Sequence, residues 1–175
     1  PIAHSPRFVD QAGHQFDEPP DNFSLAARFY DVNGDGAPDL YVANDFEDPD
    51  QFWINDGHGS FRLGPLLAQR TTSNAAMAVD FGDVNRDGKV DLFEVDMLSR
   101  DTRQLRTQIP THTALPKQPG VIEDRPQLQR NTLFLNRGDG SFAQIAELAG
   151  VDASGWSWST VLLDVDLDGY EDILV

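Results

Sequence analysis

The chain has 175 residues, of which 39% are hydrophobic, and its formal net charge at pH 7 is −16. This length and hydrophobic content suffice for one globular domain with a core, whereas the negative charge argues against binding to nucleic acid or to an anionic membrane surface. The absence of cysteine excludes disulfides and thiolate chemistry, and no apolar run approaches the ~20 residues that a membrane helix needs.

The first segment, residues 1–23, is expected to be the end of a preceding repeat unit. Its Phe8 lies where the aromatic residue of a hairpin turn would stand before the first acidic loop, allowing for one deleted residue. The segment has no signal-peptide character. We therefore expect either that such a peptide was removed or that the chain is an internal piece of a longer protein.

Two short motifs then recur along the chain. An acidic motif appears three times, as DVNGDGAPDLYV from Asp31, DVNRDGKVDLFE from Asp83 and DVDLDGYEDILV from Asp164. A glycine-rich motif appears twice, as NDGHGSF from Asn55 and NRGDGSF from Asn136. Glycine-rich residues before an aromatic residue predict a tight hairpin turn.

The spacing of these motifs defines a repeat unit. Each glycine-rich motif lies 28 positions before the next acidic motif, and the acidic motifs lie 52 and 81 positions apart, a difference of 29. A unit of about 52 residues therefore repeats, and its second copy carries an insertion of 29 residues. A repeat of this size is typical of propellers and repeat arrays.

Each unit contains short segments rich in aromatic and β-branched residues, which predict strands of about six residues. Four strands per unit form a propeller blade. The sequence thus predicts an all-β fold, a β-propeller fragment of four-stranded antiparallel blades, with about two full blades and partial blades at both ends. We expect a single propeller region over 1–175, with units at 24–66, 76–146 and 157–175, the last one truncated.

The insertion, residues 98–130, holds six of the thirteen basic residues, only three acidic residues and four prolines. The prolines exclude one long helix or strand through the whole segment. A surface excursion and a partner-binding loop are both compatible with this composition.

The acidic motifs place oxygen ligands at positions 1, 3, 5 and 9, with a glycine at position 6 for a sharp turn and a backbone carbonyl at position 7 that can face the same centre. Hard oxygen ligands in flexible number suit Ca²⁺, so we expect up to three calcium ions. The expected metal ligands are Asp31, Asn33, Asp35, Ala37, Asp39, Asp83, Asn85, Asp87, Lys89, Asp91, Asp164, Asp166, Asp168, Tyr170 and Asp172. Because affinity follows ligand charge, the third loop should bind most tightly and the second least.

The second loop also fits the EF-hand pattern, with Glu94 at position 12. The other two loops have Val42 and Val175 there, so the glutamate is not a repeated feature. The runs of aromatic and β-branched residues after every loop favour strands rather than an exiting helix. We therefore expect Glu94 to lie on the second strand of its blade, away from the ion.

The stretch NTLFLNRGDGSFAQIAELAGVDASGWSWSTVLLDVDLDGYEDILV, residues 131–175, resembles the FG-GAP/VCBS repeats. The resemblance is closest to cartilage acidic protein and ASPIC/UnbV-type proteins and more distant to integrin α-subunit propellers. It implies a propeller of seven blades when complete, with calcium between the first two strands of a blade. His58 replaces the aspartate usual in the family's hairpin turn.

Two functions remain from this reasoning. The first is a non-catalytic calcium-binding propeller module, on a cell surface, extracellular or periplasmic, that mediates adhesion by binding protein or carbohydrate and contacts the rest of its own propeller. The alternative is a calcium-dependent polysaccharide lyase or hydrolase on the same scaffold.

Three other sets of residues have side chains of the kinds that occur in functional sites. The acidic group Asp45, Glu47, Asp48 and Asp50 could in principle supply a glycosidase carboxylate pair. Trp156 and Trp158, two positions apart, are expected on one strand face, packed between blades or stacking on carbohydrate. His4, His14, His58 and His112 have no metal-ligand spacing.

Overall fold

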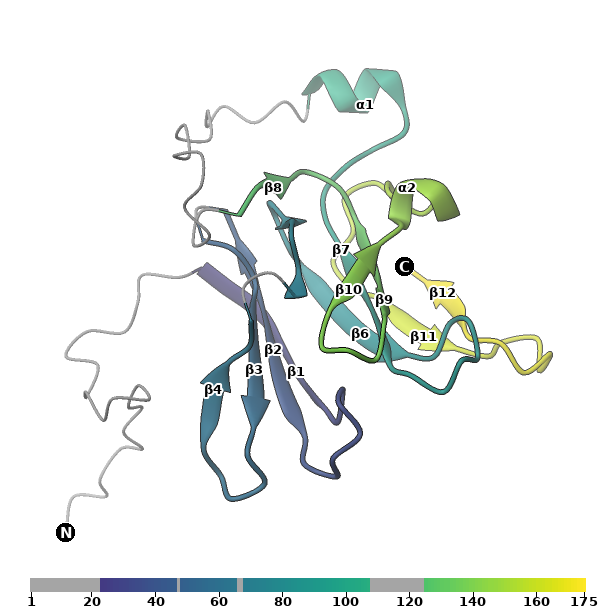
Figure 1. The fold of residues 1–175 in the computed structure, drawn as a ribbon. Coiled ribbons are helices and arrows are strands. Elements are labelled where there is room, and N and C mark those ends of the chain that lie inside the picture. The colour runs from purple at the N-terminus through teal and green to yellow at the C-terminus, as the bar shows by residue number, and fades with distance from the viewer. Residues whose placement is uncertain (1–22, 47, 66–67, 108–124) are drawn as a thin grey trace, which may run out of the picture.

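The computed structural model describes residues 23–46, 48–65, 68–107 and 125–175 (Figure 1). Within these ranges the chain forms antiparallel sheets with two short helices, so the predicted all-β class is confirmed. The predicted strand of a preceding blade in residues 1–22 and the central part of the insertion, 108–124, lie outside the described residues. The division of the chain into units at the boundaries given above stays a prediction.

The first sheet is a four-stranded antiparallel meander. Its strands, in spatial and chain order, are β1 (Phe23–Tyr30), β2 (Asp39–Asp45), β3 (Gln51–Asn55) and β4 (Phe61–Leu63). Trp53 pairs with Leu40 on one side and with Leu63 on the other, so large apolar side chains lie across neighbouring strands. The β3–β4 turn closes with a hydrogen bond from the Asp56 N–H to the Ser60 carbonyl, as the glycine-rich motif predicts.

The second sheet repeats this meander. Its strands, in spatial order, are β6 (Ala78–Gly82), β7 (Asp91–Val95), β9 (Thr132–Asn136) and β10 (Phe142–Gln144). Strands β7 and β9 pair directly, with Leu92 opposite Phe134, although the insertion separates them in the sequence. The insertion therefore leaves and rejoins the sheet between its second and third strands without disturbing the register.

The described ends of the insertion carry little regular structure. Helix α1 (Thr102–Thr107) has no buried residue, and the two-residue strand β8 (Gln127–Leu128) pairs in parallel with β5 (Thr72–Ser73). This small parallel pair ties the returning chain to the segment that precedes β6. The insertion is thus anchored at its C-terminal end.

The third sheet is a hairpin of β11 (Val161–Leu163) and β12 (Asp172–Leu174), and it lies next to β6 (Figure 1). It follows helix α2 (Ala146–Ala149), which ends at Gly150 in the left-handed conformation. The segment SFAQIAEL, residues 141–148, therefore forms a short strand followed by the start of a helix. Its residues after Gln144 follow their helical propensity.

The three sheets stand side by side (Figure 1). Aromatic side chains are buried between them. Between the first and second sheets, Tyr41 packs edge-on against Phe81, and Phe52 against Phe142. Between the second and third sheets, Phe93 and Leu162 belong to a second buried cluster. Burial of each large apolar side chain contributes about 1.5–3 kcal/mol.

The prediction that Trp156 and Trp158 share a strand face is wrong. Both lie in an irregular segment before β11, with exposed fractions of 61% and 67%. Gly155, at φ +92°, donates its N–H to the Leu98 carbonyl at 2.9 Å. This hydrogen bond holds the start of the segment close to the end of β7.

Candidate metal centre

Each acidic motif forms the loop between the first two strands of its sheet. Residues 31–38 join β1 to β2, residues 83–90 join β6 to β7, and residues 164–171 join β11 to β12. In Figure 1 the loops lie along the lower and right-hand margin of the three sheets, from the β1–β2 loop at the bottom to the β11–β12 loop at the right. The repeat therefore presents its acidic groups on one side of the molecule.

The side chains at positions 1 and 3 close each loop by accepting backbone N–H groups. In the third loop, Asp164 accepts from the N–H of Asp168 at 3.1 Å and from that of Gly169 at 2.8 Å. Asp166 also accepts from the Asp168 N–H, at 3.1 Å. The first two loops repeat these bonds. Because an oxygen has two lone pairs, these bonds leave acceptor capacity for a cation.

In the first two loops the aspartate at position 9 also joins the loop to the hairpin turn by hydrogen bonds, a role that the sequence did not reveal. Asp39 accepts from the N–H of Val32 at 3.2 Å and from that of Asn55 at 2.9 Å, so it ties the loop to the hairpin turn of its own sheet. Asp91 does the same with Val84 and Asn136. The recurrence of the two motifs together was the available indication, since each hairpin motif begins with the asparagine whose N–H donates this bond.

Two positions of each loop require the left-handed conformation. Position 6 is a glycine in all three loops, with φ of +87°, +81° and +89°. Position 4 is Gly34 in the first loop but Arg86 (φ +58°) and Leu167 (φ +63°) in the others. A non-glycine residue in this conformation costs about 1 kcal/mol. The second and third loops therefore hold local strain that the first does not.

Burial, with a smaller contribution from neighbouring carboxylates, raises the pKa of the position-9 aspartate in the first two loops. Burial raises the pKa of Asp91 to about 6, and the nearby carboxylates of Asp87 and Asp83 add to this rise. Burial, together with Asp35 and Asp31, likewise raises the pKa of Asp39. A bound cation would offset both effects, because it favours the ionised carboxylates.

The side-chain oxygens converge most closely in the third loop. Asp164, Asp166 and Asp172 each place a carboxylate oxygen within 4.8 Å of the others, and among the described residues no other group of three acidic or histidine side chains is so compact. Asp168 lies outside this group, and its Oδ1 accepts the Tyr170 N–H at 2.8 Å. The first and second loops carry an asparagine where the third carries Asp166.

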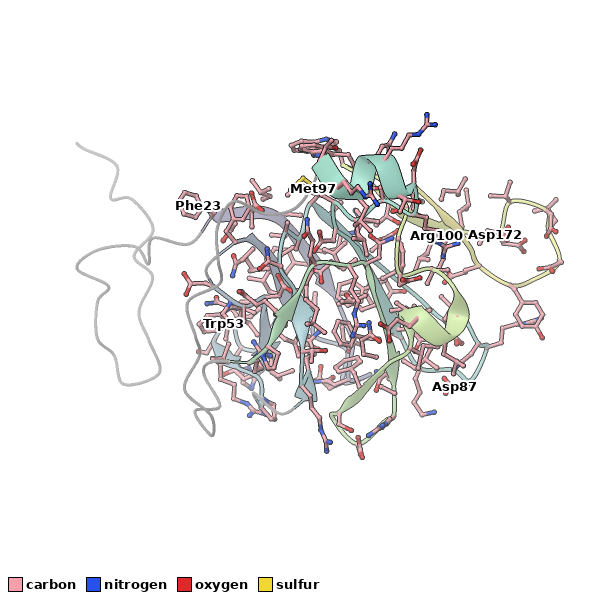
Figure 2. All side chains as sticks on the ribbon, turned by 90° about the horizontal axis from the view of Figure 1, so that it is seen from above. Phe23, Trp53, Asp87, Met97, Arg100 and Asp172 are labelled. Atoms are coloured by element: carbon pink, nitrogen blue, oxygen red, sulfur yellow. The ribbon has the colours of Figure 1, made fainter. Side chains whose placement is uncertain are left out.

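Two basic side chains of the second loop contact residues of the second and third loops. The Lys89 ammonium donates to Asp87 Oδ2 at 2.8 Å, and this contact lowers the pKa of Asp87. The Arg86 guanidinium lies 4.9 Å from the centre of the Tyr170 ring, so the second loop contacts the third. Asp87 and Asp172 mark the two loops in Figure 2.

The other candidate residues fall into different surroundings. Glu94 is fully buried on β7, the second strand of its sheet, and its Oε2 accepts a hydrogen bond from Thr132. Asp50 is also fully buried, so it is out of reach of a polysaccharide and cannot act as a glycosidase carboxylate. His58 lies exposed in the β3–β4 turn, whereas His4, His14, Glu47 and His112 lie outside the described residues.

A repeated four-stranded meander with an acidic loop between its first two strands defines a propeller-type repeat protein. The sequence matches the FG-GAP-like repeat family over residues 31–94 and 121–175, more than half of the chain, so the chain belongs to this family. Repeats of this family occur in propeller and adhesion proteins, typically extracellular or at surfaces, and are generally non-catalytic. The search of curated proteins gave no match. Among the described residues no helix is long and apolar enough to cross a membrane.

Proposed function

We propose that the three acidic loops each bind one calcium ion and that the chain is a non-catalytic, calcium-binding propeller module. The observation that carries this proposal is the convergence of Asp164, Asp166 and Asp172 within 4.8 Å. Ionised carboxylates so close together repel one another unless a cation lies between them. Oxygen-only ligands in a flexible loop favour Ca²⁺ over softer metals.

The full ligand set of each loop consists of the side chains at positions 1, 3, 5 and 9 and the carbonyl at position 7, which belongs to Ala37, Lys89 and Tyr170 in the three loops. In the third loop, Asp168 at position 5 would add a fourth carboxylate to the group of three formed by Asp164, Asp166 and Asp172. Aspartates at positions 1 and 9 are already fixed by backbone N–H donors. This fixation supports the proposal because it lowers the entropy that the loop would lose on binding.

We expect the third loop to bind calcium most tightly, then the first and then the second. The third loop has four carboxylates among its ligand positions, whereas the others have three and an asparagine. In the second loop the Lys89 ammonium already contacts Asp87, and calcium must displace it or share the carboxylate with it. Affinity for calcium rises with ligand charge, which favours this order.

The wider role we propose is adhesion or scaffolding by a secreted, surface-borne or periplasmic protein of the cartilage acidic protein and ASPIC/UnbV type. Its partner would be a protein or a glycan. Calcium at millimolar concentration outside the cell would keep such loops occupied. Structural calcium between strands suits a binding module, since it rigidifies the loops without requiring any reacting group.

Isothermal titration of the full chain with CaCl₂, and separately with MgCl₂, tests the metal. We expect calcium to bind and the tightest site to disappear in Asp164→Ala, with Asp48→Ala, an exposed aspartate outside the loops, as the matched control. Binding that is equal for the two ions, or an unchanged titration in Asp164→Ala, would contradict the proposal.

Incubation with acidic polysaccharides tests the wider role. Retention of the polysaccharide without cleavage is expected of a binding module, and calcium-dependent cleavage would refute that role.

A further inference from the structure

Two carboxyl groups outside the acidic loops lie fully buried between the first and second sheets. Asp50 directly precedes β3, and Glu94 is in the middle of β7. One oxygen of each is held, because the Asn44 N–H donates to Asp50 Oδ1 at 2.8 Å and the Thr132 hydroxyl donates to Glu94 Oε2 at 3.0 Å. The remaining oxygens, Asp50 Oδ2 and Glu94 Oε1, are buried, and within the described part of the chain neither meets a hydrogen-bond partner at ordinary hydrogen-bond geometry.

These two carboxyl groups are within hydrogen-bonding reach of each other. If both were ionised, two buried carboxylates would face each other, which is among the least favourable arrangements in a protein interior. The Tyr41 hydroxyl offers a hydrogen bond to Asp50, and a proton on either carboxyl group supplies a further donor, directly between the two.

Among the described residues, Arg125 brings a compensating positive charge to the pair. The Arg125 guanidinium, from the end of the insertion, donates to the Asp50 carbonyl at 2.7 Å and to the Gln69 carbonyl at 3.2 Å. The Tyr41 hydroxyl faces the same cluster and accepts from Gln69 at 3.4 Å. With one proton, Asp50, Glu94 and Arg125 together are neutral.

Two further acids lie nearby. Asp96 acts on Glu94 from the end of β7, and its own Oδ2 accepts hydrogen bonds from the Ser73 hydroxyl and from two backbone N–H groups. Asp45 faces Asp96 from the end of β2. Asp96 thus adds negative charge beside Glu94, which increases the free energy of removing the proton from the pair.

We propose that Asp50 and Glu94 retain a shared proton at neutral pH and that this proton joins the first sheet to the second, making the junction a pH-sensitive lock. Asp50 adjoins the first sheet and Glu94 belongs to the second. An isolated antiparallel bridge also pairs Asp45, at the end of β2, with Ala75, in the segment before β6. Arg125 brings the insertion to the same junction. Loss of the proton would loosen the packing of the two sheets and the anchor of the insertion together.

The direction of the pH effect follows from burial. Burial raises the pKa of Asp50 from 3.8 to about 7, and burial followed by the charge of Asp50 raises the pKa of Glu94 well above its usual value. The unfolded chain releases these protons near pH 4, whereas the folded chain keeps them. Between pH 4 and pH 7 the folded chain therefore binds more protons, and its stability falls as the pH rises. Below this range both states are protonated, and no further gain is expected from the pair.

Urea denaturation of the full chain between pH 4.5 and pH 8, in EDTA so that metal binding plays no part, tests the lock. We expect the midpoint of the wild type to fall as the pH rises. Asp50→Asn, whose amide donates to Glu94 without needing a proton, should flatten this dependence, whereas Asp48→Asn should keep it. A wild-type slope in both Asp50→Asn and Glu94→Gln would overturn the proposal. This outcome leaves the calcium titration unaffected, so the two proposals fail separately.

Infrared spectroscopy of the wild type provides a measurement that needs no folded variant. Exposed carboxyl groups lose the absorption of the protonated C=O above about pH 5. We expect a protonated C=O band to persist at pH 7 in EDTA and to disappear when the chain is unfolded in urea. The absence of the band in the folded chain would refute the shared proton. Its loss on addition of CaCl₂ would refute it as well, because the pair would then be a cation site.

Discussion

Replacement of Asp80 should reveal how the three sheets are held to one another. This carboxylate lies on β6, the first strand of the second sheet, and is 5% exposed. Its Oδ1 accepts from the Arg28 guanidinium on β1 at 2.6 Å, and its Oδ2 accepts from the Leu162 N–H on β11 at 2.9 Å. One side chain thus connects the first strands of all three sheets.

The two contacts differ in what their loss should cost. The Arg28 side chain is half exposed and can be hydrated when its partner is lost, so the ion pair contributes about 0.5–1 kcal/mol. The Leu162 N–H is buried, and leaving it without an acceptor costs about 1–3 kcal/mol more. Asp80→Asn, which keeps an acceptor for Leu162, should therefore destabilise the chain by about 1 kcal/mol, and Asp80→Ala by about 2–4 kcal/mol.

Urea denaturation measures the free-energy contributions of the ion pair and of the Leu162 hydrogen bond. The proteins compared are the wild type, both Asp80 variants, Arg28→Ala and the Arg28→Ala/Asp80→Ala double variant. The double-mutant cycle should give a coupling of about 0.5–1 kcal/mol between Arg28 and Asp80. Equal destabilisation by Asp80→Asn and Asp80→Ala would show that the Leu162 hydrogen bond contributes nothing. A coupling of zero would show the same for the ion pair.

Three further predictions concern the loops. Lys89→Ala should tighten calcium binding at the second loop, because it removes the ammonium group from Asp87; unchanged or weaker binding in a calorimetric titration would contradict this. Leu167→Gly should stabilise the calcium-free chain by about 0.5–1 kcal/mol, because Leu167 has φ +63° and is 85% exposed; denaturation in EDTA measures this, and a loss of stability would refute the strain. Glu94→Gln should leave calcium binding at the second loop intact, since Glu94 faces Thr132 and Asp50; loss of that site by titration would restore the EF-hand interpretation.

The repeat could be predicted from the sequence because each of its parts is local. The acidic loops recur three times with the same residue types at the same positions, and each is closed by hydrogen bonds between residues at most five positions apart within the loop, such as Gly169 to Asp164. The hairpin turns are equally local. The insertion could be located by arithmetic alone, because the spacing changed while the flanking motifs did not.

Features that depend on contacts between sheets left no pattern in the sequence. Just before Trp156 and Trp158, where a strand was expected, the N–H of Gly155 donates a hydrogen bond to the carbonyl of Leu98, far away in the chain. The pairing of Asp50 with Glu94 arises only when two sheets pack face to face. From the sequence, Asp50 was one acid among several in a loop, and Glu94 was the last residue of a calcium pattern.

Thermal denaturation of the full chain in calcium and in EDTA is the most direct test of the proposed calcium module. At a hundredfold excess over Kd, each filled site should stabilise the fold by ~2.7 kcal/mol. For a chain of this length, that corresponds to a rise in Tm of about 5–11 °C per site. We predict a large fall in Tm on adding EDTA, restored by excess Ca²⁺ and not by the same concentration of Mg²⁺. An identical Tm with and without calcium would mean that the loops are closed by their own hydrogen bonds alone.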